Sequence, residues 1–282
     1  MALRKIKSVF PAVREDIADL RTQRALPTQH IDQVDPFLFL NHHGPQIYPR
    51  NNNGLPFGPH PHRGFQTVTF ILEGDIAHRD SGGHESVINE GGIQWMVAGR
   101  GLVHEEISSH NFMEDGGPLE ILQLWVNLPA RLKMTEPSYI GLQANQIPIH
   151  EISHGLGKLQ LISGKWNGHH GPILPLTEMA IMTVDLKKSA EFSLSIPSEE
   201  NIFFYVVRGG VSVNGSRIEK FHLADFSNEG DEISIHAESD AYILLCHARP
   251  FDEPVVSYGP FVMNTRQEIQ QAILDYQAGR FS

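Results

Sequence analysis

The sequence has a single cysteine, Cys246, among its 282 residues. One thiol cannot form an intramolecular disulfide, so no disulfide framework holds this chain together, which agrees with a reducing compartment. No apolar run approaches the roughly 18 residues that a membrane-spanning helix requires. No apolar stretch follows the basic residues near the start, so we expect no signal peptide. We therefore expect a cytoplasmic protein that does not associate with membranes.

Positive charge is also scarce. The chain has 22 Lys and Arg against 33 Asp and Glu, a formal net charge of −11, and its basic residues form no cluster. A surface of this sign repels phosphate backbones, so direct nucleic-acid binding is disfavoured and a macromolecular partner would be a protein. The sequence also has no G-x-S-x-G motif and no glycine-rich phosphate loop, which argues against a serine hydrolase or nucleotide-binding enzyme.

The segments that are present are short, apolar and separated by Gly, Pro, Asn and Asp. Such spacing is typical of an all-β sandwich or barrel. The clearest predicted strands are residues 67–73, 93–97, 119–128, 158–166, 179–186, 192–196, 202–207, 211–213, 232–236 and 241–247.

Helical signals are few. Thr265 and Glu268 form a capping box, apolar residues then recur at helical spacing, and Gly279 is a suitable stop. This pattern predicts one short C-terminal helix. Residues 14–24 are a weaker candidate for a second short helix.

The two halves of the chain contain similar strand–glycine turn–strand units, at 69–80 and 204–215. One long sandwich with a chance resemblance between hairpins would also explain them. We favour two β domains, residues 1–140 and 141–282, with the C-terminal helix in the second and a connection within 130–148.

Histidines carry the chemical signal. His60 and His62 are two residues apart, as are His104 and Glu106. In extended strands, residues at this spacing point to the same side, so two such pairs on neighbouring strands can direct three nitrogens and one carboxylate to one centre. This donor set suits first-row divalent metals. Four ligands on one side of an octahedron leave two adjacent positions open, as a catalytic site requires.

Longer strings than H-x-H carry a family resemblance. The segments HPHRGFQTVTFILEGDIAHRDSGGH (60–84), IQWMVAGRGLVHEE (93–106), LQLWVNLP (122–129) and GPFVMNTRQEIQQAILDYQAGRF (259–281) resemble the pirin family of the cupin superfamily. The resemblance covers most of the chain.

The resemblance implies a bicupin: two facing antiparallel β-barrels with metal only in the first. It implies that His60, His62, His104 and Glu106 are the ligands and that the metal is Fe(II), while Mn, Co, Ni, Cu or Zn would suit the same donors. The second half has no H-x-H motif, and His169 and His170 are adjacent, so a second metal is not expected.

Several residues near the motifs have open interpretations. Arg63 could pair with a carboxylate near the metal or lie solvated on the outer face. Alternation places Gln66 on the same side as His62, toward the pocket. Phe57 is expected in the core or the pocket wall. The histidines at 42, 43, 78 and 84 are assigned to loops or the surface.

The resemblance implies a dioxygenase that opens flavonol-like aromatics such as quercetin with O2. Glu106, the one carboxylate ligand, would be the base for a substrate hydroxyl whose pKa the metal lowers. The main alternative is a redox-sensing regulatory protein that acts through a protein partner without turnover, since eukaryotic pirin is described as a nuclear transcription cofactor. A non-oxidative cupin such as an isomerase is the third interpretation.

Overall fold

The computed structural model describes residues 2–281, and these residues divide into two compact units. One unit comprises residues 14–24, 37–145 and 251–282, and we call it the metal-motif unit because it contains the predicted ligands. The other comprises residues 1–13, 25–36 and 146–250, and we call it the C-terminal unit. Both are built from antiparallel sheets, as the strand pattern predicted.

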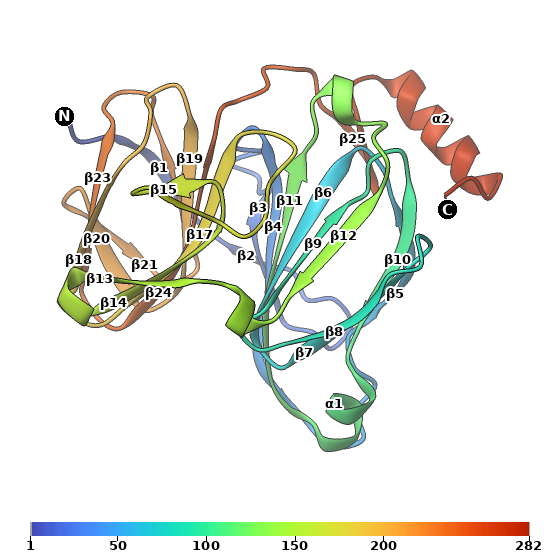
Figure 1. The fold of residues 1–282 in the computed structure, drawn as a ribbon, viewed down its shortest axis with the longest axis horizontal. Coiled ribbons are helices and arrows are strands. Elements are labelled where there is room, and N and C mark those ends of the chain that lie inside the picture. Colours follow the sequence, from blue (N-terminus) through green and yellow to red (C-terminus); the bar gives the residue numbers. More distant parts are fainter. Residues whose placement is uncertain (1, 282) are drawn as a thin grey trace. The chain divides into compact units, whose positions relative to one another are not determined.

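Two sheets form the metal-motif unit, and they appear in Figure 1 as two curved layers. The larger sheet has the order β12 (Ser138–Leu142), β9 (Ile93–Val97), β6 (Phe65–Glu73), β11 (Gly117–Asn127), β4 (Phe37–Tyr48), β3 (Thr22–Leu26), β2 (Val13–Arg14). The smaller has the order β5 (Phe57–His62), β10 (Leu102–Ile107), β7 (Asp75–Asp80), β8 (Glu85–Asn89).

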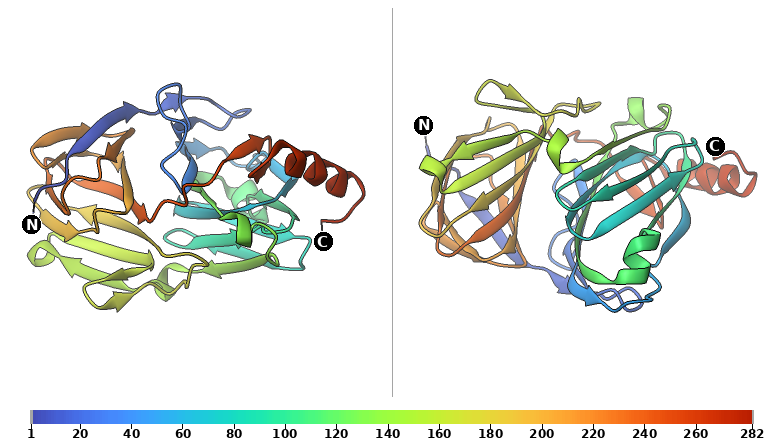
Figure 2. Two further views of the ribbon diagram at one scale, coloured as in Figure 1. Left: turned by 90° about the horizontal axis from the view of Figure 1, so that it is seen from above. Right: turned by 60° about the horizontal axis from the view of Figure 1, so that its bottom comes forward.

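The C-terminal unit repeats this plan, and Figure 2 shows its two layers from other sides. Its larger sheet has the order β1 (Ile6–Pro11), β22 (His222–Phe226), β19 (Asn201–Arg208), β24 (Ala241–Ala248), β17 (Met179–Leu186), β14 (Gly157–Ser163), β13 (Ile149–Ile152). Its smaller sheet has the order β18 (Glu191–Ser195), β23 (Glu232–Ala237), β20 (Gly210–Val213), β21 (Ser216–Glu219). A separate hairpin joins β15 (Lys165–Trp166) to β16 (His169–His170).

The chain does not divide into the contiguous domains 1–140 and 141–282. One boundary does fall near the expected point, between residues 145 and 146. However, the N-terminal residues 1–13 belong to the C-terminal unit, and the C-terminal residues 251–282 belong to the metal-motif unit. The reason is pairing at long range. Strand β1 completes the larger sheet of the C-terminal unit through β22, and residues 251–282 pack on the metal-motif unit.

The C-terminal segment ends in helix α2 (Arg266–Gln277), which follows the hairpin of β25 (Val256–Tyr258) and β26 (Phe261–Met263). The predicted N-cap is present, because the Thr265 hydroxyl accepts from the Glu268 amide at 3.2 Å. The Glu268 carboxylate accepts from the backbone amide of Asn264, one residue before the cap, at 3.1 Å, so the second bond of the capping box is shifted by one residue. An apolar cluster that includes Phe261, Ile269 and Phe281 joins helix and hairpin. None of the helices in residues 2–281 is long and apolar enough to cross a membrane.

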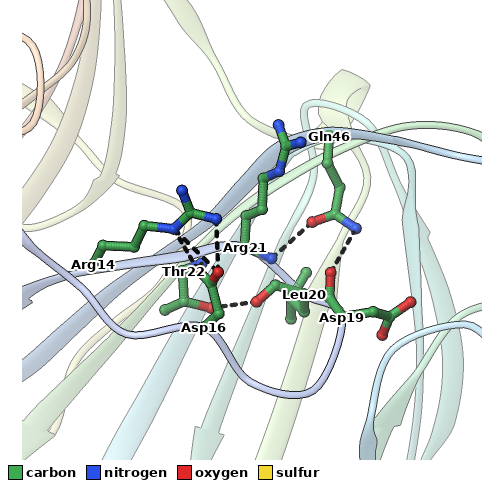
Figure 3. A network of polar contacts seen from close by, with 7 residues as sticks. All are labelled: Arg14, Asp16, Asp19, Leu20, Arg21, Thr22 and Gln46. Atoms are coloured by element: carbon green, nitrogen blue, oxygen red, sulfur yellow. Dashed lines mark hydrogen bonds and ion pairs between the residues drawn. The ribbon is translucent and has the colours of Figure 1, made fainter.

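Two details of the helix prediction were wrong. A second helix, α1 (His110–Asp115), begins at an N-cap serine that sequence patterning missed. Residues 14–24 contain no helix; they form a tight polar turn between β2 and β3 (Figure 3).

Side-chain bonds to the backbone stabilise that turn in place of helical bonds. Asp16 accepts from the Thr22 amide at 3.1 Å, and Gln46 accepts from the Arg21 amide at 2.8 Å (Figure 3). Ala18 adopts a φ of 53°, which a helix does not allow.

Candidate metal centre

Neighbouring strands β5 and β10 bring the three predicted imidazole ligands together. His104 lies directly opposite His60 in the antiparallel pairing, and His62 shares the face of His60 because alternate residues point the same way. The ring centroids are 4.4 Å apart for His60 and His104, and 4.9 Å apart for His62 and His104. One ring nitrogen from each histidine lies within 4.8 Å of the others. The strand geometry therefore converges three nitrogens on one point.

Backbone carbonyls fix the orientation of two of these rings. The Nδ1 of His60 is 2.7 Å from the Gly58 oxygen, and the Nδ1 of His62 is 3.3 Å from the Pro260 oxygen. A carbonyl can only accept, so Nδ1 carries the proton in both rings and Nε2 keeps its lone pair for a metal. Pro260 belongs to the C-terminal segment, so the end of the chain helps to orient a candidate ligand.

Burial keeps the imidazoles of His62 and His104 neutral. Desolvation, with a smaller effect from His60, lowers the pKa of His62 to about 3. Desolvation, with smaller effects from the neighbouring histidines, also holds the pKa of His104 well below its ordinary value. Neutral imidazole is the form that coordinates metals.

His104 provides the test of whether a metal fits here. Its side chain is 1% exposed, and neither ring nitrogen has a hydrogen-bond partner among the described residues. An unpartnered buried polar atom costs about 1–3 kcal/mol. A divalent metal on the shared point of the three rings would satisfy one of these nitrogens. The donor set and the unpartnered ring therefore fit a metal ion.

Glu106, the fourth predicted ligand, lies outside the three-histidine group. It is buried on the same face of β10 as His104, two residues further along. Its carboxylate accepts hydrogen bonds from the Thr69 hydroxyl at 2.9 Å and from the Gln123 amide at 2.6 Å. The structure thus brings three of the four predicted ligands together and holds the carboxylate beside them with two donors that the sequence did not single out.

Arg63 satisfies neither of the two interpretations offered for it. It is 4% exposed, so it is not a solvated charge, and its carboxylate partner is not at the metal centre. Its guanidinium donates to Asp275 of helix α2 at 2.7 Å and to the Arg100 carbonyl at 2.6 Å, and it stacks over the Phe281 ring at 4.6 Å. Arg63 therefore anchors the C-terminal segment.

Gln66 also points away from the histidines. Its side-chain oxygen accepts from the Trp95 indole at 3.1 Å, and it lies on the opposite face of β6 from Thr69, which bonds to Glu106. The expectation counted alternation from His62 to Gln66, but the turn at Gly64 (φ +88°) interrupts the strand. Phe57, the other pocket candidate, packs on the core with its ring 5.3 Å from that of His43.

Most of the histidines assigned to loops are buried in strands. His78 in β7 bonds to Asp80 at 3.0 Å, and its ring is 5.4 Å from that of His104. His42 in β4 pairs with Glu120 at 2.8 Å. Only His84 matches the expectation, with 43% of its side chain exposed. The H-x-D spacing in β7 was the sequence signal that would have placed His78 inside.

His43 makes folding stability sensitive to acid. It is 1% exposed, its Nδ1 lies 2.9 Å from the Thr22 hydroxyl, and desolvation lowers its pKa to about 3. Between pH 6.5 and 3 the unfolded chain binds a proton that the folded chain does not, so stability is lost as the pH falls through this window.

For metal-free protein, we expect His43→Asn to reduce the loss of unfolding free energy between pH 7 and pH 5 by about 2 kcal/mol. Urea denaturation at the two pH values measures this difference. If the wild type and the variant lost the same unfolding free energy between pH 7 and pH 5, His43 would not be a source of the acid sensitivity.

Comparisons with known proteins identify the family of this chain. Residues 19–126 match the family model described as Pirin, and residues 181–282 match the model described as Pirin C-terminal cupin domain. A "Pirin-like protein" from Caulobacter vibrioides is 39% identical over 98% of both chains. The crystal structure of a quercetin 2,3-dioxygenase from Acinetobacter baumannii is 34% identical, covers 100% of this chain and 99% of its own, and superposes with a TM-score of 0.94. The chain therefore is a bicupin with a C-terminal helix and belongs to the pirin family.

Proposed function

We propose that this protein is a metal-dependent dioxygenase that opens flavonol-like aromatics with O2, and that its metal is Fe(II). The observation that carries the proposal is the group of three converging imidazoles, in which neither ring nitrogen of the buried His104 has a hydrogen-bond partner among residues 2–281. Relatives support the reaction class, because the Acinetobacter baumannii structure is that of a quercetin 2,3-dioxygenase.

The side chains around the histidines support an aromatic substrate. Trp125 lies 5.2 Å from the His62 ring and 4.6 Å from the Phe39 ring, measured between centroids. Trp125, Phe39 and His60 are each partly exposed, whereas His62 and His104 are buried. In this proposal a planar substrate stacks on this aromatic wall beside the metal centre.

Each residue has a distinct role in this proposal. His60, His62 and His104 would hold the metal, with Glu106 as the fourth ligand or as a carboxylate beside it. The metal would supply a Lewis acid that lowers the pKa of a substrate hydroxyl. Glu106 would accept the proton of that hydroxyl. Thr69 and Gln123 hold its carboxylate in place, because both donate a hydrogen bond to it.

Oxygen uptake tests the function. Protein stripped with a chelator and reloaded separately with Fe, Mn, Co, Ni, Cu or Zn should consume O2 with quercetin when loaded with iron, and the metal-free protein should not. A flavone that lacks the hydroxyl next to the ketone is the control substrate and should not be turned over. Absence of oxygen uptake with every metal would refute the dioxygenase proposal. Elemental analysis of protein from its own host identifies the resident metal.

A further inference from the structure

The C-terminal unit has a cavity of its own, distant in sequence from the metal motif. It measures about 690 Å³ and is lined only by residues from 164–200 and by His247, all of which belong to that unit. The lining comes from the β15–β16 hairpin, the segment that follows it, and strands β17, β18 and β24. Cavities of roughly 300–1,000 Å³ accept drug-sized molecules.

Apolar side chains dominate one part of this cavity. Ile173, Leu174, Leu176 and Met179 line it, and Trp166 contributes an indole ring. Leu174 is 93% exposed and Leu176 is 42% exposed. Two exposed leucines and a tryptophan in the lining of one cavity indicate a surface that an apolar, planar ligand would cover.

One polar pair gives the cavity directionality. The Nδ1 of His247 is 2.5 Å from a carboxylate oxygen of Glu200, and both residues line the cavity. Nδ1 donates its proton to this carboxylate, and the other ring nitrogen, Nε2, has no hydrogen-bond partner among residues 2–281. A neutral ring accepts a hydrogen bond at Nε2 and a protonated ring donates one there. A hydroxyl group can do both, so it matches the ring in either state.

The charges of the lining disfavour an ionic ligand. Lys165 is the one basic side chain of fixed charge in the cavity, and Glu178 and Glu200 are acidic. A carboxylate or phosphate ligand would face two negative groups against one positive group. An ammonium ligand would have to compete with His247 for Glu200 and would face the positive charge of Lys165. A neutral ligand avoids both costs.

We propose that this cavity is a second binding site, for a neutral aromatic molecule with a hydroxyl group that bonds to His247 while its ring packs on Trp166 and the apolar lining. The site is separate from the metal centre. The interior of the C-terminal unit is filled by apolar side chains such as Met182, Phe204 and Leu245, and the described residues contain no second group of metal-type ligands. We therefore expect the second site to bind its ligand without metal-dependent turnover.

Fluorescence titration with 2-naphthol tests the proposal. The host protein is the full chain carrying His104→Leu, so that coordination of the probe by a metal at the first site does not contribute to the binding. We expect saturable binding of one 2-naphthol per chain. Naphthalene, which lacks the hydroxyl, should bind about 10-fold more weakly, because a lost hydrogen bond of up to about 1.5 kcal/mol corresponds to roughly that factor. 2-Naphthoate and naphthylmethylammonium should bind more weakly still.

Three variants assign the site. His247→Phe keeps a ring but removes the hydrogen bond, and it should weaken 2-naphthol binding about 10-fold without changing naphthalene binding. Ser195→Trp, at an exposed lining position, should fill the cavity and abolish binding of both probes. His236→Phe is the matched control, because His236 also faces a glutamate through Nδ1, at 3.6 Å, but lies outside the cavity.

Unchanged 2-naphthol affinity in both His247→Phe and Ser195→Trp would overturn the proposal. Preference for either charged analogue over 2-naphthol would overturn the ligand class. If His247→Phe fails to fold, Ser195→Trp still tests whether the probe binds in this cavity, because a substitution at an exposed residue should not disturb folding.

Discussion

Replacing His104 by leucine should cost at least about 100-fold in metal affinity and, at the same time, stabilise the metal-free protein. Outer partners of metal ligands are typically worth 10–100-fold in affinity, so the loss of a ligand should reach or exceed the upper end of that range. The stability change has the opposite sign because both ring nitrogens of His104 are buried and have no hydrogen-bond partner in the described part of the chain. An apolar side chain of similar size removes that penalty, and we expect a gain of about 1–3 kcal/mol in unfolding free energy.

His78→Leu is the matched control for this prediction. His78 is a buried histidine of the adjacent strand β7, but its Nε2 bonds to Asp80. Its replacement should reduce stability by about 1–3 kcal/mol and change metal affinity less than 10-fold. Chelator competition with Fe(II) or Co(II) gives the affinities, and urea denaturation of metal-free protein gives the stabilities. A destabilised His104→Leu protein that retains its metal would show that the ring has a structural role only.

Glu106→Gln should lower kcat for O2 consumption by about 10²–10⁴-fold, the range that general acid–base groups contribute. Glutamine has nearly the same shape and can still accept from Thr69 or Gln123, so the fold should be retained. It cannot take up a proton at neutral pH, so the effect falls on kcat. Rates must be normalised to bound metal, since loss of a carboxylate ligand would also reduce occupancy.

Glu105→Gln provides the control for the carboxylate. Glu105 is adjacent in sequence but lies on the other face of β10, with its carboxylate 3.5 Å from Arg79. Its replacement should leave kcat within about 2-fold, because an ion pair with the exposed Arg79 contributes at most about 1 kcal/mol to stability and faces away from Glu106. Equal rates for wild type and Glu106→Gln, at equal metal content, would exclude Glu106 as the base and leave the metal-centre assignment to the histidines.

The tertiary structure decided what surrounds the ligands. Pro260, whose carbonyl orients His62, is 198 residues further along the chain, and Asp275, which pairs with Arg63, is 212 residues from it. Thr69 and Gln123 reach Glu106 from two other strands of the metal-motif unit. Contacts of this kind leave no local pattern, because neither partner needs a particular neighbour in sequence. The exchange of chain ends between the two units was hidden for the same reason.

Local periodicity, by contrast, was readable from the residues alone. The bounds of β9 and β17 match the predicted strands, and helix α2 begins at the predicted capping box, since alternation and capping are interactions between near neighbours. The i, i+2 spacing of His60 and His62 likewise fixed their common face, because a strand has a period of two. That inference failed at Gln66, where a turn resets the period. The sequence by itself therefore determined strands such as β9 and β17, the final helix and the common face of His60 and His62, whereas only the folded chain decided which distant side chains hold Glu106, orient His62 and line the cavity of the C-terminal unit.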